Sequence, residues 1–406
     1  MARAGQSVLN GIRVIELGGV AAVPFCGLML SWLGAEVIKF EPAGGDDDAR
    51  RLAPFVRVGD GGVESAMFAY LNSGKKMVSF DETTDAGRTA LADLVASATV
   101  VVHDGSLEFC GQSLGPTVGD TYPGLVACAI TPYGWDGPHA GVPACDLTTN
   151  AVGGDCYLNP AGLAHHENPE GEPLKMAGFS ASYTGGLAAC LAIMASLFRQ
   201  GLTGLGDFID VSEQDVQVSM SREQIMWAVN ENVLETRDTR ALPVGGCFEC
   251  KDGYVQVYVF SDEHWAALRV IMGDPVWARD ERYAAALDRA KHNDEVNAGI
   301  ESWLRLKERD ELYTAAKKHG VTLAPYLGPA DVIADPQEVD RGFPAPFVVG
   351  DLTLGITPGF PFAMSETTPV RPTGGWRRGQ DTAAVLSGVG VGPADIEALV
   401  AGEVSE

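Results

Sequence analysis

Gly11-Ile-Arg-Val-Ile-Glu-Leu17 and Glu36-Val-Ile-Lys-Phe40, with the apolar residues 25–33 between them, decide the fold of this chain. The two quoted runs are short and apolar, which predicts strands, and the segment between them has the composition of a helix that ends at Gly34. Two strands joined through a crossover helix pair in parallel, so the sequence predicts an α/β fold. The loop 18–24 lacks the Gly-x-Gly-x-x-Gly spacing, so it does not predict a dinucleotide site.

The alternation of strands and helices continues along the chain and changes character near residue 225. The predicted strands are 76–80, 99–102, 125–130 and 207–211, and the predicted helices are 85–96, 185–198 and one from 212, with a turn at 201–206. The alternating run 253–260 instead predicts an antiparallel strand, and 264–319 is helical and charged. We therefore expect residues 225–325 to form a smaller α+β domain. Later strands are predicted at 347–349 and 352–354, and two short helices from residue 381.

Composition limits the partners and the location. The chain has 406 residues with 29 basic and 54 acidic side chains, a net charge of −25, which disfavours nucleic acid and an anionic membrane as partners. A phosphate-bearing ligand such as CoA would need a local basic patch. The chain contains no run of about 20 apolar residues of the kind that predicts a membrane span. Its first residues lack the apolar core of a secretory signal. These features predict a cytoplasmic protein.

Cysteine usage agrees with that location. The eight cysteines are scattered along the chain, as expected for reduced thiols. Cys247 and Cys250 have the spacing of half a zinc or redox site, but no second such pair or pair of histidines accompanies them. The sequence therefore predicts no metal site.

Five spaced segments resemble, in the family's order and spacing, the class III CoA-transferases and their relatives, the α-methylacyl-CoA racemases. They are residues 9–42, which include Val20-Ala-Ala-Val-Pro24 and Leu33-Gly-Ala-Glu-Val-Ile-Lys-Phe-Glu-Pro42; Asn72-Ser-Gly-Lys-Lys-Met-Val-Ser-Phe-Asp81; Gly134-Trp-Asp-Gly-Pro138; Gly201-Leu-Thr-Gly-Leu-Gly-Asp-Phe-Ile-Asp-Val-Ser212; and Arg378-Gly-Gln-Asp-Thr382. The resemblance implies a Rossmann-like large domain built from both chain ends, 1–224 and 326–406, with the small domain 225–325 between them. It also implies that two chains interlock as a dimer.

The resemblance implies two alternative chemistries. In the transferases an aspartate attacks a CoA thioester and forms a mixed anhydride, CoA returns to give an enzyme thioester, and the acceptor acid takes the CoA. In the racemases, acid–base residues exchange the proton next to the thioester carbonyl. Both reactions need a carboxylate, which can form an anhydride or can take and return a proton near neutral pH.

Ser182 stands where this family carries its catalytic aspartate. The segment Phe179-Ser-Ala-Ser-Tyr-Thr-Gly-Gly186 aligns in this way, and a shift of one residue would place Ala181 or Tyr183 there instead. None of the three is acidic, and the nearest acids in sequence, Glu172 and Asp207, lie outside the motif. A serine hydroxyl is a poor base and needs an activating base of its own. We therefore expect this chain to be inactive at position 182.

The CoA-binding features are also altered. The resemblance assigns Val20 and Ala22 to the CoA-binding loop. Three aspartates at 46–48, in a region where relatives often place a basic residue, repel a polyphosphate, although such a run is also typical of a solvated loop. A second departure is 103–109, which lacks the Asn-Phe turn and nearby arginine of the family. The cations left as phosphate contacts, or equally as surface charges, are Arg50, Arg51, Lys75 and Lys76.

Asp146 is the remaining candidate acid. It follows Cys145, where racemases place a histidine before the aspartate, so the acid–base pair is incomplete. An aspartate before a helix commonly accepts N–H bonds as an N-cap, which is the favoured interpretation. A surviving catalytic acid is the alternative.

Three functions follow from these features. The first is a subunit of a heteromeric class III CoA-transferase that acts on carboxylic acids and acyl-CoA thioesters, in which a related chain carries the aspartate. This arrangement resembles the succinyl-CoA:benzylsuccinate CoA-transferases. The second is a homodimeric acyl-CoA lyase, hydratase or isomerase with a reworked site. The third is a catalytically inactive acyl-CoA-binding protein.

Overall fold

The computed structural model describes residues 7–43, 47–58, 62–106, 114–161, 164–165, 168–237, 244–349, 352–369 and 376–401. The chain divides into two compact units. Unit 1 comprises Met1–Gly153, Met176–Ser221 and Pro336–Glu406, and unit 2 comprises Gly154–Lys175 and Arg222–Asp335. The sequence placed the domain boundaries at 224/225 and 325/326, and it assigned residues 154–175 to the large domain.

Unit 1 is built on a parallel six-stranded sheet with the order β5-β2-β1-β6-β7-β8. Its strands are β1 (Arg13–Leu17), β2 (Glu36–Pro42), β5 (Lys76–Phe80), β6 (Val100–His103), β7 (Val126–Thr131) and β8 (Asp207–Ser212). This sheet confirms the predicted α/β fold. Each predicted strand of this sheet is present within two residues of its expected bounds.

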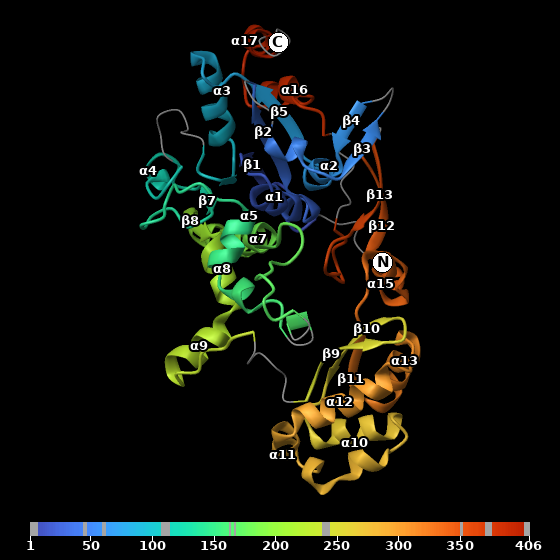
Figure 1. Cartoon of the computed structure of the whole chain (residues 1–406). Coiled ribbons are helices and arrows are strands. Elements are labelled where there is room, and N and C mark those ends of the chain that lie inside the picture. Colours follow the sequence, from blue (N-terminus) through green and yellow to red (C-terminus); the bar gives the residue numbers. More distant parts are fainter. Residues whose placement is uncertain are drawn as a thin grey trace. The chain divides into compact units, whose positions relative to one another are not determined.

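Both faces of the sheet are covered, so consecutive residues of a strand are apolar and buried on opposite faces. Val14 of β1 packs into the layer that contains α1 (Ala22–Trp32) and α7 (Ser180–Thr203). The next residue, Ile15, points to the opposite layer, which contains α3 (Asp85–Ala96), α16 (Thr382–Gly388) and α17 (Pro393–Ala401). Figure 1 shows α3, α16 and α17 beside the β2–β5 edge of the sheet.

The helix predicted at 185–198 is longer than expected. α7 begins at Ser180 and continues through residues 201–203, which were predicted to form a turn. It ends at Gly204, which adopts the left-handed conformation (φ 75°) common at helix ends.

By length and composition α7 is, among the helices of the described residues, the one that could cross a membrane. The sequence did not predict a span there. Its small residues, including Ala181, Gly185 and Ala189, are buried in unit 1. One such helix is weak evidence of a membrane span, and α7 packs along α1 on its buried side.

The C-terminal return segment covers the edge strand β5. Asp381 accepts a hydrogen bond from the Met77 N–H at 2.8 Å, and its own N–H donates to the Met77 carbonyl at 2.9 Å. Thr382 Oγ1 accepts from the Ser79 N–H at 3.0 Å. The motif 378–382 therefore satisfies backbone groups that an edge strand would otherwise expose.

The remaining elements of unit 1 are short. They are η1 (Asp48–Arg51), β3 (Phe55–Val58), β4 (Gly62–Ser65), α2 (Ala66–Leu71), α4 (Val118–Thr121), α5 (Asp146–Val152), α8 (Glu213–Met220), α15 (Pro336–Arg341), β12 (Pro344–Val349) and β13 (Leu352–Pro358). β3 pairs with β4, and β12 pairs with β13, each antiparallel. Strands were predicted from the sequence at 347–349 and 352–354, inside β12 and β13.

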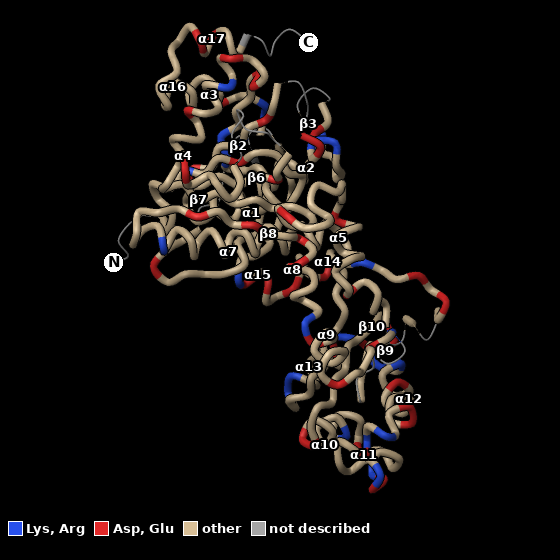
Figure 2. The backbone as a smooth tube through the Cα atoms, turned by 90° about the vertical axis from the view of Figure 1, so that its left-hand side faces the viewer, with Lys and Arg blue, Asp and Glu red and all other residues tan. Residues whose placement is uncertain are grey.

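Unit 2 has an antiparallel sheet with the order β11-β10-β9. Its elements are η2 (Asp155–Leu158), α9 (Arg222–Asn230), β9 (Gly245–Cys250), β10 (Gly253–Tyr258), α10 (Asp262–Ile271), η3 (Val276–Arg279), η4 (Glu281–Tyr283), α11 (Ala286–Lys291), α12 (Asn293–Leu304), α13 (Arg309–His319), β11 (Thr322–Pro325) and α14 (Pro329–Ala334). Figure 2 shows acidic and basic residues on α11, α12 and α13, and neighbouring charges pair, as Arg305 does with Glu301 at 2.9 Å. These charges lie around an apolar core that includes Val257, Trp265 and Ile300.

A buried ion network lies inside unit 1, where β1, β2 and α1 meet. Lys39 Nζ lies 3.0 Å from one oxygen of Glu16, and Lys75 Nζ donates to the other at 2.6 Å. All three side chains are almost fully buried. Lys75 also donates to the Pro24 carbonyl at 2.9 Å, which ties the network to α1.

Gly27 lets α1 approach this network closely. A Cβ at position 27 would lie 2.1 Å from Glu16 Oε2 and 3.2 Å from Lys75 Nζ. A side chain there would therefore force the buried carboxylate away from its lysines.

We expect Gly27→Ala to lower the free energy of unfolding by about 1–3 kcal/mol, as overpacking in a core does. Gly201→Ala is the matched control, because position 201 is also helical and has no atoms within 4 Å of the added Cβ. That control should gain about 0.5–1 kcal/mol from helix propensity. Urea titration of both variants measures the difference, and equal stabilities would contradict the assigned role of Gly27.

Candidate functional site

β1 and β6 are neighbours in the sheet, and the chain leaves their carboxyl ends toward opposite sides, which is where open α/β sheets generally bind ligands in a crevice. Gly18 and Gly19 follow β1, and Asp104 follows β6. The Gly19 N–H donates to Asp104 Oδ2 at 2.7 Å, and a Cβ at Gly18 would lie 2.6 Å from the same carboxylate. A carboxylate therefore stands at this crevice, where it repels phosphate.

The predicted CoA-binding residues Val20 and Ala22 directly follow that contact. Val20 is partly buried, and Ala22 is the first residue of α1. Gly186 of α7 packs against this point, since a Cβ there would lie 2.5 Å from the Ala22 carbonyl oxygen. Ser182 lies one turn earlier on α7, so the structure brings the starts of α1 and α7 together.

Asp146 binds the start of α7. Its Oδ1 accepts the Ser182 N–H at 3.1 Å, and its Oδ2 accepts from Asn150 Nδ2 at 3.1 Å. The prediction that Asp146 caps the helix that follows it was wrong, because Cys145 occupies the N-cap and Asp146 is the first residue of α5. Asp146 instead accepts one of the free N–H groups in the first turn of another helix, where a negative charge is favoured.

Glu213 is a second buried acid at the same turn. It follows β8 directly and is 8% exposed. Its carboxylate accepts a hydrogen bond from Thr149 Oγ1 at 3.3 Å, and the Ser182 side chain lies close enough to affect the pKa of the same carboxylate. The absence of a side chain at Gly185 makes room for it, since a Cβ there would lie 3.1 Å from Glu213 Cγ.

The proton affinity of Glu213 is altered by this position. Burial raises the pKa of Glu213 above its ordinary value, and the nearby charge of Asp146 acts in the same direction, whereas the hydrogen bonds from Ser182 and Thr149 oppose the rise. A carboxyl group with a raised pKa is suited to acid–base work near neutral pH.

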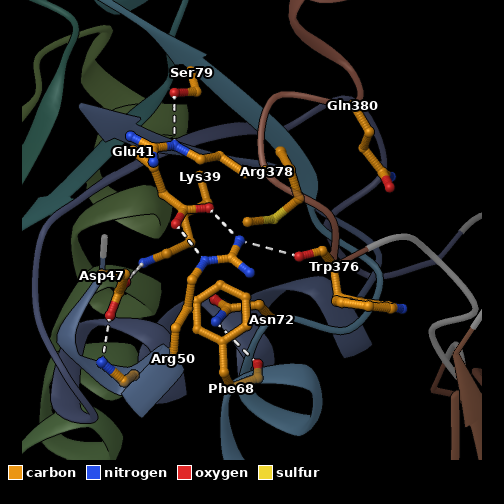
Figure 3. Close-up of polar contacts among 12 residues, drawn as sticks. Lys39, Glu41, Asp47, Arg50, Phe68, Asn72, Ser79, Trp376, Arg378 and Gln380 are labelled. Carbon is orange, nitrogen blue, oxygen red and sulfur yellow. Dashed lines mark hydrogen bonds and ion pairs between the residues drawn. The ribbon is translucent and has the colours of Figure 1, made fainter. Parts of the chain in front are cut away.

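Arg50, one of the predicted phosphate contacts, is engaged inside the protein. It binds both oxygens of Glu41 at 2.7 and 2.8 Å, donates to the Trp376 carbonyl at 3.1 Å, and stacks on Phe68 with 3.8 Å between the guanidinium carbon and the ring centroid. Figure 3 shows Arg50 held between these groups, with Arg378 beside them. These contacts join β2 to the return segment.

The other three cations lie in different environments. Lys75 is buried in the ion network, where burial lowers its pKa to about 8. Lys76 is exposed and pairs with Glu36. Arg51 is exposed and pairs with Asp48 at 2.9 Å. Of the predicted acidic run 46–48, Asp46 lies outside the described residues, and Asp47 binds Lys39 at 2.9 Å.

Among the described residues, no group of three or more His, Cys, Asp or Glu side chains has the arrangement of a metal site. The described cysteines, including Cys247 and Cys250, are free thiols.

Sequence reasoning missed Glu213 and Asp104 as site residues. Both directly follow parallel strands of the sheet, β8 and β6, so their place at its carboxyl edge was a usable signal. Glu172 and Asp207 are the acids nearest to position 182 in the sequence. The acid that lies next to Ser182 in space is instead Glu213, 31 residues further along the chain.

Residues 9–382 match the sequence model of CoA-transferase family III. The chain belongs to this family.

Relatives of this CoA-transferase family III chain span nearly all of it. It is 32% identical over 374 residues to the succinate–glutarate CoA-transferase of Agrobacterium fabrum, covering 89% of this chain and 90% of that one. It is 28% identical over 337 residues to the β subunit of succinyl-CoA–L-malate CoA-transferase of Chloroflexus aurantiacus, covering 80% of each. Among solved structures, a CAIB/BAIF family protein from Brucella suis has a TM-score of 0.80 at 28% identity, covering 93% of this chain and 98% of that one.

The raised pKa of Glu213 predicts a pH-dependent stability for this family III chain. The folded state keeps this proton to higher pH than the unfolded state does, so the contribution of Glu213 favours folding below pH 4.5 and is lost as the pH rises through the folded-state value. We expect the stability of the wild type relative to Glu213→Gln to fall as the pH rises from about 4.5.

Urea titrations at a series of pH values measure this difference. Glu397→Gln, the same substitution at an exposed position of α17, is the control variant. Parallel profiles for the wild type and Glu213→Gln would contradict the assigned environment of Glu213.

Proposed function

We propose that this chain is a subunit of a heteromeric, cytoplasmic CoA-transferase that exchanges CoA between acyl-CoA thioesters and carboxylic acids. In this proposal a related chain carries the aspartate and supplies the nucleophile. The observation that carries the proposal is the state of Ser182. Its N–H donates to Asp146 at 3.1 Å, its side chain lies beside the Glu213 carboxylate, and the residue is 7% exposed.

A serine held in this way is a poor replacement for the aspartate. The transferase reaction needs an acyl anhydride that passes CoA on with little loss of energy, and a serine ester does not do this. Glu213 and Asp146 are present nearby, but both carboxylates hold the first turns of α5, α7 and α8 through hydrogen bonds. In this proposal the two acids therefore stabilise the first turns of these helices and do not act as catalytic residues.

The CoA-binding side supports the same proposal. Arg50 and Lys75 are bound within the fold, and Asp104 places a negative charge at the crevice. We propose the backbone of residues 20–22 and the exposed cations Arg51 and Lys76 as the remaining CoA contacts. A partner chain with an intact site would carry most of the CoA affinity.

The outer face of α7 supports the presence of a partner chain. Leu187, Leu191, Phe198 and Leu202 are 50%, 73%, 73% and 75% exposed. Their spacing of four, seven and four residues places them on one side of the helix. A contiguous apolar face of this kind marks a protein–protein contact. One relative, from Chloroflexus aurantiacus, is named as the β subunit of a CoA-transferase.

A second candidate is favoured by Glu213 specifically. Glu213 is a buried carboxyl group beside the Ser182 hydroxyl, where it is placed to act as the base that deprotonates this hydroxyl. The chain would then work alone, as a homodimeric acyl-CoA lyase, hydratase or isomerase. The oligomeric composition and the activity of the pure chain distinguish the two candidates.

Native mass spectrometry of the tagged chain recovered from its own host tests the first candidate. We expect a stoichiometric complex with a related chain that has an aspartate at the position of Ser182. The complex should exchange CoA between thioester and acid, and the purified chain should not. A homodimer that turns over an acyl-CoA by itself would favour the second candidate instead.

A nucleophile restored at position 182 should conflict with Glu213. Ser182→Asp places a third carboxylate beside Asp146 and Glu213, so we expect it to lower the free energy of unfolding by about 1–3 kcal/mol. The double variant Ser182→Asp/Glu213→Gln should recover that stability. Exchange activity in the double variant but not in the single one would show that Glu213 obstructs the restored nucleophile.

Ser180→Asp is the matched control, because it adds the same charge to the first turn of the same helix, at a side chain that contacts Asn150 and not Glu213. It should be stable and inactive. A single Ser182→Asp variant as stable as this control would show that the acids at this turn do not interact as described.

A further inference from the structure

Unit 1 contains an apolar cavity of about 610 Å³ that the site described so far does not use. It lies between α1, the start of α2, the first turn of α7 and strand β13. In the part of the chain that the structure describes, no lysine, arginine, aspartate or glutamate lines it. Its volume is within the range of about 300–1,000 Å³ that is usual for small-molecule sites.

Aromatic side chains give the cavity a defined shape. The rings of Phe25 and Tyr183 have centroids 5.0 Å apart, and those of Trp32 and Tyr70 are 6.3 Å apart in an edge-on arrangement. Such pairs fix each other's orientation. Met29 and Met67 complete part of the wall with flexible apolar side chains.

The polar groups that line the cavity are few. Two of them are the hydroxyls of Tyr70 and Tyr183. Burial raises the pKa of Tyr70 to about 12, and each hydroxyl is neutral at physiological pH. A charged ligand group would find no counter-ion among these lining residues, and its burial would be costly. The cavity therefore favours an uncharged, apolar group.

The cavity adjoins the position of the missing nucleophile. Phe179 and Tyr183, which line it, occupy the turn of α7 that contains Ser182. Ser182 immediately precedes Tyr183 in the chain. A carboxyl or thioester group near this turn would thus have an apolar compartment beside it for the rest of the molecule.

We propose that this cavity binds the apolar alkyl or aryl group of the chain's carboxylic acid or acyl-CoA substrate, so that the substrate class is a monocarboxylic acid with a bulky apolar group. This inference rests on the proposed function and adds the substrate class to it. It also predicts that short dicarboxylates are poor substrates, because the second carboxylate of such a substrate would lie unpaired in the cavity.

Isothermal titration calorimetry of the full chain with octanoate and with succinate tests the proposal directly. We expect octanoate to bind and succinate to bind at least tenfold more weakly. Ile356→Asp, at a 52% exposed position of β13 that lines the cavity, should weaken octanoate binding at least tenfold. Val348→Asp is the matched control, since Val348 is 54% exposed on the neighbouring strand β12 and does not line the cavity.

The proposal is overturned if octanoate fails to bind the wild type, or if it binds Ile356→Asp as well as Val348→Asp. It is also overturned if octanoate binds the isolated chain but not the assembled complex, because partner side chains would then fill the cavity. This titration needs no turnover. Octanoate binding without any CoA exchange by the complex would contradict only the proposed function, and exchange with succinyl-CoA without octanoate binding would contradict only this inference.

Discussion

The buried ion network of Glu16, Lys39 and Lys75 is the constraint on which unit 1 depends. Glu16 and Lys39 are directly opposite each other in the parallel pairing of β1 and β2. A shift of one residue would place the carboxylate against the apolar layer on the other face, so the network fixes the strand register. Burial by itself lowers the pKa of Lys39, yet the carboxylates of Glu16 and Asp47 raise it above its ordinary value. Lys39 therefore remains charged. Removal of either member of the buried pair would leave the other charge buried without a partner, which destabilises the fold.

The same network fixes where the site can form. Lys75 holds the Pro24 carbonyl and Gly27 admits the Glu16 carboxylate, so α1 has one position over the sheet. The start of α1 then sets the start of α7 through the contact between Ala22 and Gly186. The acids at this edge, Asp146 and Glu213, are fixed relative to Ser182 by this chain of contacts. A lysine that was a candidate for phosphate binding thus acts on the site indirectly, through the fold.

The fold could be predicted from the sequence because strands buried on both faces have consecutive apolar residues, as at 14–15 and 37–38, and because the helix between them implies parallel pairing. The length of α7 could not be predicted, since Gly201 and Gly204 suggest a turn and only the second ends the helix. The loss of the aspartate was visible at Ser182, but the acid that contacts it was not. Glu213 comes from a different strand, and sequence distance does not report proximity across a sheet. Lys75 and Lys76 are adjacent in sequence, but Lys75 is buried and Lys76 is exposed. Because side chains alternate along a strand, the sequence predicts that the two differ, but not which of them is buried.

The closure of β5 by residues 378–382 has a consequence for how the protein is made. β5 ends at Phe80, so about 300 further residues must be synthesised before its covering segment exists. At roughly 5–20 residues per second, this leaves a bare strand edge on the nascent chain for roughly 15–60 s. An open edge of that kind is a template for pairing with other chains. A cell that makes this protein must therefore shield the edge during translation, and a truncated chain that lacks its last 30 residues would keep the edge open permanently.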